Sequence, residues 1–152
     1  MVEQSCNNEE LWHSIDGMLK GWLDGRKKTL ELYCQLSDHQ NPTPEWEDVS
    51  EFMQVLLDYV SAGHFEIYDK LVGEARSFKD DNMKLVDILY PKIHDTTQVA
   101  LDFNDKYPSQ QNWESDCNEF NFDLTELGKQ LAIRAELEDS LIEQLHDSHK
   151  PE

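Results

Sequence analysis

Two Glu-x-x-His tetrads contain the residue types best suited to hold a metal ion. They are Glu10–His13 and Glu143–His146. Carboxylate-bridged metal bundles combine two such tetrads with one glutamate from each of the other two helices. Both tetrads lie at the outer ends of predicted helices, however, and a chain with 32 acidic residues and six histidines will contain so short a motif by chance. We therefore predict no metal site and no cofactor, and keep a carboxylate bundle that binds a metal or a small ligand as the alternative.

Ser61 and His64 are the residues closest to a nucleophilic pair. Residues three apart on a helix are ordinary neighbours, and the chain has no Gly-x-Ser-x-Gly elbow and no phosphate-binding glycine loop. The three cysteines, Cys6, Cys34 and Cys117, are odd in number and lack the spacing of metal ligands. This favours free thiols in a reducing compartment. We therefore predict that the protein is not an enzyme.

A second set of polar residues lies on otherwise apolar helix faces: Arg26, Thr97, Asn104, Arg134 and Glu138. Arg134 and Glu138 are four residues apart, so they can pair along one helix. Buried charges must be paired, because an unpaired one is strongly destabilising. We predict that this set forms a structural polar core. A polar cavity for a small ligand is the alternative.

The middle of the second predicted helix contains Gly63, where glycine costs about 1 kcal/mol relative to alanine. Such a glycine indicates a bend or the close approach of a neighbour. Helical phasing turns Asp58, Ala62 and Phe65 to the side opposite the apolar stripe. An exposed acid beside an exposed aromatic is either a solvated face or an anchor for a basic partner. Spacing alone does not decide between these two interpretations.

Helices must position all these residues, because apolar residues recur at helical spacing and no strand-like alternation persists. Pro42, Pro44 and Pro108 mark the breaks. Short connections make neighbouring helices antiparallel. We predict an all-α fold, an antiparallel up-down four-helix bundle with long helices that can bend at Gly63 or Pro91. The four helices are expected over residues 8–37, 46–77, 82–107 and 117–147.

The length of 152 residues favours a single domain over residues 1–152, with short flexible ends at about residues 1–7 and 147–152. No apolar run approaches the ~18 residues of a membrane span, so we expect no membrane partner. The first residues, Met1–Cys6, lack the basic and apolar regions of a secretion signal. We therefore expect a cytoplasmic location.

The net charge of −19 results from 32 acidic residues against 13 lysines and arginines. Nucleic acid is a poor direct partner for such a chain, because phosphate binding needs a basic surface. A basic protein surface is a good partner, because opposite fields speed and orient association. The alternative is that the acidity only confers solubility.

Four stretches resemble the regulator of sigma D family, the Rsd/AlgQ anti-sigma factors. The most specific is Asp58-Tyr59-Val60-Ser61-Ala62-Gly63-His64-Phe65, within residues 57–68. The others are residues 22–26 continuing through 32–33, residues 102–107, and residues 127–139. Together they extend in order over nearly the whole chain.

The resemblance implies a helical bundle that binds the primary sigma factor of bacterial RNA polymerase in a 1:1 complex. Binding would cover the basic C-terminal domain of sigma, which reads the −35 promoter element and contacts the polymerase core. Alternative sigma factors would then be favoured in stationary phase. By the same resemblance Asp58 is the first candidate for a sigma contact, followed by His64, Phe65, Trp22 and Arg26.

Overall fold

Helical structure dominates the computed structural model, which describes residues 2–38, 44–78 and 83–151. Four long rods account for most of it. Three are single α-helices: α1 (Val2–Ser37), α4 (Met83–Lys106) and α6 (Cys117–Leu145). The other rod continues from α2 (Trp46–Ala62) through a π-helical turn, η1 (Gly63–Ile67), into α3 (Tyr68–Ser77). Two short elements, α5 (Gln110–Ser115) and the 3-10 turn η2 (Asp147–His149), complete the fold.

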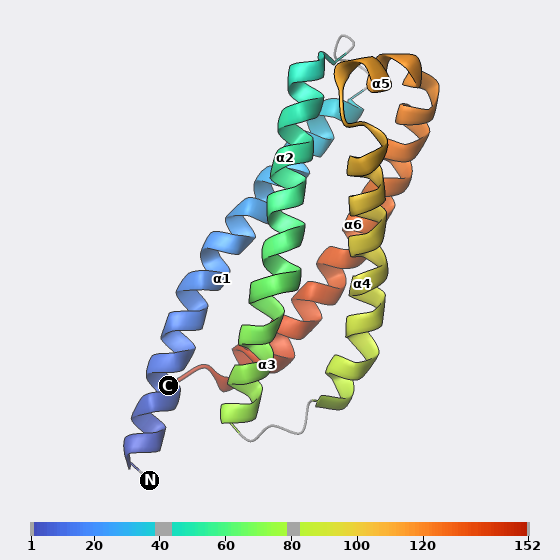
Figure 1. Ribbon diagram of the computed structural model, residues 1–152. Coiled ribbons are helices and arrows are strands. Elements are labelled where there is room, and N and C mark those ends of the chain that lie inside the picture. The colour runs from blue at the N-terminus through green and yellow to red at the C-terminus, as the bar shows by residue number, and fades with distance from the viewer. Residues whose placement is uncertain (1, 39–43, 79–82, 152) are drawn as a thin grey trace.

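Successive rods run in opposite directions, as Figure 1 shows. Along their lengths α1 packs on α2, α4 packs on α6, α2 contacts α4, and α3 contacts α6. The predicted all-α helical bundle is thus confirmed. The first helix begins at Val2 rather than near residue 8, and α4 continues through Pro91, close to the predicted range 82–107.

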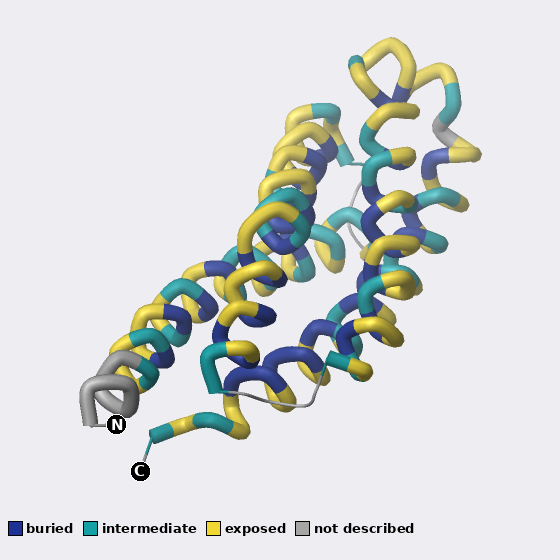
Figure 2. Tube along the Cα trace, turned by 60° about the horizontal axis from the view of Figure 1, so that its bottom comes forward, coloured by how far each residue is buried: buried dark blue, intermediate teal, exposed yellow. Residues whose placement is uncertain are grey.

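Apolar stripes at helical spacing form the core between the rods, and buried positions line their inner sides (Figure 2). In the second rod the stripe is buried throughout: Phe52, Leu56, Val60, Ile67 and Leu71. In α6 the buried positions include Leu124, Leu127, Leu131 and Leu141. Removing this apolar surface from water is the main stabilising contribution, at about 25 cal/mol per Å².

The connection between α4 and α6 contains a helix that its polar composition does not reveal. The Ser109 hydroxyl accepts a hydrogen bond from the backbone N–H of Asn112 at 3.3 Å and so caps α5. This helix buries Trp113, whose ring centroid lies 6.0 Å from those of Trp46 and Phe120. The predicted polar loop therefore also closes one end of the core.

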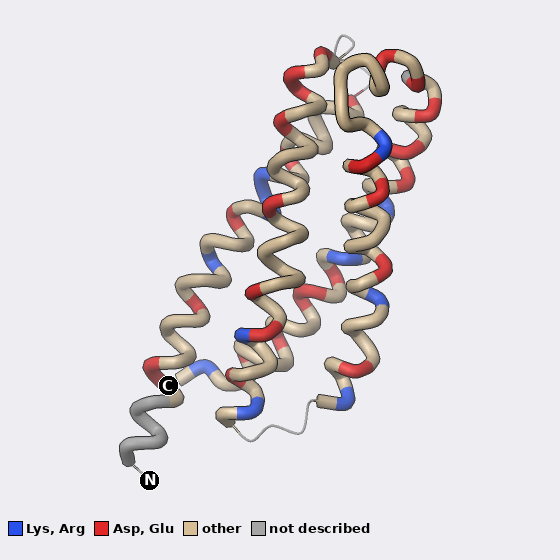
Figure 3. The backbone as a smooth tube through the Cα atoms, in the orientation of Figure 1, with Lys and Arg blue, Asp and Glu red and all other residues tan. Residues whose placement is uncertain are grey.

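Acidic residues occur along all four rods, and basic residues are sparse between them (Figure 3). None of the helices in the described part of the chain has the length and apolarity needed to cross a lipid bilayer.

Candidate partner-binding surface and the polar network beneath it

Gly63 begins the π-helical turn, and its close neighbours explain why a glycine is needed there. Its backbone is helical (φ −58°, ψ −52°), so the residue does not supply an unusual dihedral angle. A Cβ at this position would lie 3.1 Å from Trp22 Cζ2, 3.1 Å from the Tyr68 hydroxyl and 3.2 Å from Arg134 Nη2. Gly63 therefore lets α1 and α6 pack close to the second rod. The π-helical turn begins at this closely packed glycine, and such turns are frequent at functional sites.

The outer side of this segment exposes three side chains of the family-like stretch. Asp58 is exposed, Leu57 beside it is partly exposed, and Phe65 is 76% exposed. His64 is half-buried, and its ring meets Phe65 edge-on with centroids 4.8 Å apart. Ala62, expected on this side, is half-buried against the core. An exposed aromatic of this size next to acidic residues is suited to contact a partner.

Trp22 and Arg26 lie below this surface rather than on it. Trp22 is buried, and its indole N–H donates to the carbonyl oxygen of Tyr59 at 3.1 Å. Arg26 is largely covered, with 18% of its side chain exposed, and pairs with Asp139 at 2.9 Å and with Glu138 at 3.4 Å. Trp22 therefore connects α1 to the rod that carries the exposed segment, and Arg26 connects α1 to α6.

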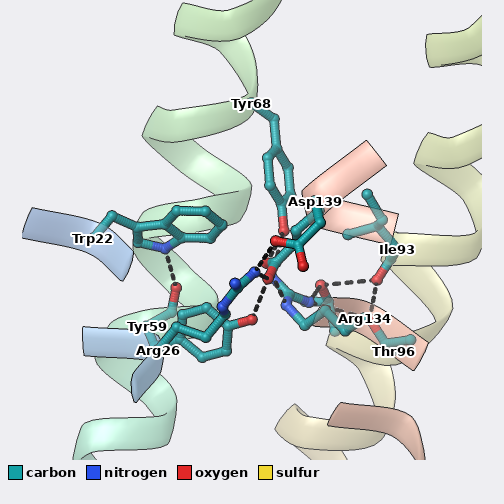
Figure 4. Close-up of polar contacts among 10 residues, drawn as sticks. Trp22, Arg26, Tyr59, Tyr68, Ile93, Thr96, Arg134 and Asp139 are labelled. Atoms are coloured by element: carbon teal, nitrogen blue, oxygen red, sulfur yellow. Dashed lines mark hydrogen bonds and ion pairs between the residues drawn. The ribbon is translucent and has the colours of Figure 1, made fainter. Parts of the chain in front are cut away.

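A buried network centred on Arg134 and Glu138 occupies the middle of the bundle (Figure 4). Arg134 donates through Nε to Glu138 at 3.0 Å and through Nη2 to the Tyr68 hydroxyl at 2.7 Å. Its Nη1 donates to Thr97 at 2.6 Å and to Thr96 at 3.2 Å, both on α4. The guanidinium of α6 thus ties α3 and α4 together.

Besides Arg134, three residues donate hydrogen bonds to the carboxylate of Glu138. The hydroxyl of Tyr68 donates to its Oε2 at 2.8 Å, and the hydroxyl of Tyr59 donates to its Oε1. Arg26 from α1 approaches the same Oε1 at 3.4 Å. Buried charges are tolerated when they are paired and hydrogen-bonded in this way. The network therefore fixes all four rods relative to one another behind Gly63.

The protonation states in this network follow from burial and from charge. Burial alone would lower the pKa of Arg134, but the neighbouring Tyr68 and Glu138 raise it above its ordinary value. Burial and the Glu138 carboxylate both raise the pKa of Tyr59 and of Tyr68. The arginine therefore stays charged at neutral pH, and both tyrosines keep the protons that they donate.

Three of the residues predicted as a polar core, Thr97, Arg134 and Glu138, are brought together by the structure, and Arg26 joins them at the edge. Asn104 is not: it is half-buried and lines a shallow groove near Trp46. Sequence reasoning missed Tyr59, Tyr68 and Thr96, which all form hydrogen bonds within the network. The available signal was that tyrosines on an inward stripe need partners for their hydroxyls.

The two Glu-x-x-His tetrads do not form a shared site. Glu10 and His13 are exposed, whereas His146 is buried, with its ring stacked on Trp12 at 4.3 Å between centroids. Its Nδ1 lies 2.8 Å from both Glu74 carboxylate oxygens, and its Nε2 lies 3.0 Å from Asp16. Among the residues that the structure describes, no group of three or more histidine, cysteine or acidic side chains is arranged to hold a metal ion.

Burial opposes the charged form of His146, but the hydrogen bonds with Glu74 and Asp16 raise its pKa above the ordinary value. The same contact with His146 lowers the pKa of Asp16. A protonated imidazole donates to both carboxylates and joins the end of α6 to α3 and α1. This cluster is an ion-paired clamp rather than a metal site.

The fold and these sites define an acidic helical bundle with an exposed acid and an exposed aromatic on its second rod, and the described residues show no cluster arranged to hold a metal ion. Residues 1–146 match the family model described as "Regulator of RNA polymerase sigma(70) subunit, Rsd/AlgQ". The chain belongs to the Rsd/AlgQ family, as the resemblance of its motifs indicates. This is a family of regulators and not of enzymes.

Proteins named "Regulator of sigma D" are similar to this chain over nearly its whole length. The chain is 32% identical over 143 residues to a protein named "Regulator of sigma D" from Yersinia enterocolitica, covering 89% of this chain and 86% of the relative. It is 30% identical over 154 residues to the protein of the same name from Pectobacterium atrosepticum, covering 97% of this chain and 100% of the relative. The comparison with solved structures found no match.

Proposed function

We propose that this protein is an anti-sigma factor that binds the primary sigma factor of bacterial RNA polymerase through the C-terminal, promoter-recognising domain of sigma. By covering that domain it blocks the contacts of sigma with the polymerase core and with −35 promoter DNA. Sigma is sequestered in a 1:1 complex in the bacterial cytoplasm, and alternative sigma factors gain access to the core in stationary phase. The mechanism is competitive masking, without any chemical step.

The observation that carries this proposal is the exposure of Asp58 and Phe65 within the most specific family stretch. Asp58 supplies a charge for a basic side chain, and Phe65 supplies apolar contact area of the kind that anchors interfaces. The buried network behind Gly63 supports this surface and holds it rigid, which lowers the entropic cost of binding. His64 contacts Phe65 edge-on and extends the aromatic surface.

The net charge of −19 supports the same assignment. A domain that reads promoter DNA needs a basic surface, and an acidic partner is attracted to it over a distance. We assign Trp22 and Arg26 an indirect role, because from α1 Trp22 holds the second rod and Arg26 holds α6.

Size-exclusion chromatography with light scattering tests the proposal, using the purified primary sigma factor and a truncated form without its C-terminal domain. We expect a 1:1 complex with the full-length factor and none with the truncated form. The association rate should fall as salt is raised from about 50 to 500 mM, because the charges become screened. A complex that forms equally well with the truncated factor would refute the assignment of the domain.

A further inference from the structure

A hollow of about 490 Å³ lies between the η1–α3 segment and α4. Aromatic rings make up much of its lining, from Phe65, Tyr68 and Tyr90, and Pro91 and Ile93 add apolar surface. This volume is in the range of small-ligand sites, which combine apolar walls with a few convergent polar groups. The hollow is distinct from the Arg134 network, because the Tyr68 hydroxyl points into that network while its ring lines the hollow.

Few polar groups line this hollow, and two of them, Asp69 and Tyr90, lack an ion-pair or hydrogen-bond partner among the described residues. The Asp69 carboxylate is exposed and forms no ion pair within the described part of the chain. The Tyr90 hydroxyl is buried and has no hydrogen-bond partner among the described residues. Burial and the nearby Asp69 charge raise the pKa of Tyr90 to about 12. The negative charge of Asp69 is therefore close enough to Tyr90 to act on the side of the hollow that Tyr90 forms.

Two imidazoles complete the lining. The rings of His64 and His94 come from opposite sides of the hollow, with centroids 5.8 Å apart. They add flat faces on which a ring or an apolar stem can lie. The carboxylate of Asp69 is the only acidic group among the residues that line the hollow.

The chemistry of these walls favours one class of ligand. The faces of aromatic rings attract cations, most strongly within about 6 Å of the ring centre, and Asp69 adds a full negative charge. The net charge of −19 concentrates cations at the surface and repels anions. We propose that this hollow binds an organic cation, a protonated amine or guanidinium on an apolar stem, with its charge beside Asp69 and its stem against Phe65 and Tyr90. This site does not depend on the proposed binding of sigma.

A titration followed by ¹H–¹⁵N NMR tests the site, with phenethylammonium as the probe and phenylacetate as its anionic counterpart. We expect saturable shifts with phenethylammonium at the backbone amides of residues 64–69, 90 and 92–94, and none with phenylacetate. Asp69→Asn should weaken binding roughly three- to fivefold, the size expected for an exposed ion pair.

Asp95→Asn is the matched control. It removes the same charge from an exposed position on α4 that does not line the hollow, so affinity for the probe should be unchanged. Equal binding of phenylacetate, equal weakening by the two substitutions, or shifts spread over acidic residues of every rod would overturn the proposal.

The cation can come from a free small amine or from a lysine or arginine side chain of a protein partner, and a competition arm separates these sources. Binding of the primary sigma factor is measured with saturating phenethylammonium chloride and with sodium chloride at the same ionic strength. Weaker binding only with the amine shows that sigma and the amine compete for this hollow, whose Phe65 wall is also proposed to contact sigma. Unchanged binding, with the probe still shifting the same amides in the complex, identifies a free amine. Failure of sigma to bind at all would refute the proposed function and leave the probe titration to decide this site.

Discussion

Replacing Arg134 with methionine should destabilise the protein far more than the same replacement at Arg26. Neither Arg134 nor Glu138 has any exposed side-chain surface. Arg134→Met removes the guanidinium and leaves a buried carboxylate with two tyrosine donors and Arg26 at 3.4 Å. Breaking a buried ion pair by removing one partner costs about 3–5 kcal/mol. Because Arg26 still neutralises part of the charge, we expect the lower end, about 3 kcal/mol.

Urea denaturation followed by circular dichroism measures this cost. With a slope of about 2 kcal/mol/M, a loss of 3 kcal/mol lowers the midpoint by roughly 1.5 M. Arg26→Met is the control, because Arg26 is partly exposed and its closer partner, Asp139, is 61% exposed. Its loss should cost about 1 kcal/mol or less, which is a midpoint shift of roughly 0.5 M.

A double-mutant cycle isolates the coupling between the two buried charges. Glu138→Gln keeps an acceptor for the tyrosine hydroxyls and removes the charge that Arg134 faces. Arg134→Met combined with Glu138→Gln should lose less stability than the sum of the single losses, by about 1–3 kcal/mol. Equal midpoints for Arg134→Met and Arg26→Met, or strict additivity in the cycle, would refute the view that this network is a coupled buried ion pair.

Gly63→Ala should lower the unfolding free energy by about 1–2 kcal/mol in urea titrations, because the added Cβ would lie 3.1 Å from Trp22. Gly17→Ala is the control. A Cβ at Gly17 would have no neighbour within 4 Å, so this substitution should raise the unfolding free energy by up to about 1 kcal/mol. A stabilising Gly63→Ala would contradict the close-packing argument. The raised pKa of His146 adds stability that is complete below about pH 6.5, the unfolded value, and is lost as the pH rises through the higher folded value. His146→Gln should flatten the stability profile between pH 6 and 9, and an unchanged slope would exclude the clamp with Glu74.

The long elements were predictable because their signal is repeated many times along the chain. Each rod carries an apolar residue at nearly every turn, so the stripe from Phe52 to Leu71 could be assigned without contacts. The helix α5 and the π-helical turn were not predictable. The first is six residues long with one apolar side chain, and the second lies where Gly63 packs against Trp22 and Arg134, which are far away in the sequence.

The residues of the polar network also fall into those that the sequence could predict and those that it could not. Helical phase predicted that Arg134 and Glu138 face the inside and can pair, because residues four apart are neighbours on a single helix. Phase alone could not identify Tyr59 and Tyr68 as their partners, since it shows that a buried hydroxyl needs a partner but not which residue of another helix supplies it. Nor could it place Asn104, because the end of α4 lies beside a groove rather than in the packed centre.

The surface around Asp58 is proposed to bind the primary sigma factor, and isothermal titration calorimetry of three proteins tests this binding. The wild type should bind the primary sigma factor with 1:1 stoichiometry. Asp58→Asn should bind roughly five- to tenfold more weakly, a loss of about 1–1.4 kcal/mol. Glu136→Gln, which removes one charge from an exposed position on α6, should bind like the wild type. No binding by the wild type, or equal affinities for Asp58→Asn and Glu136→Gln, would contradict the claim.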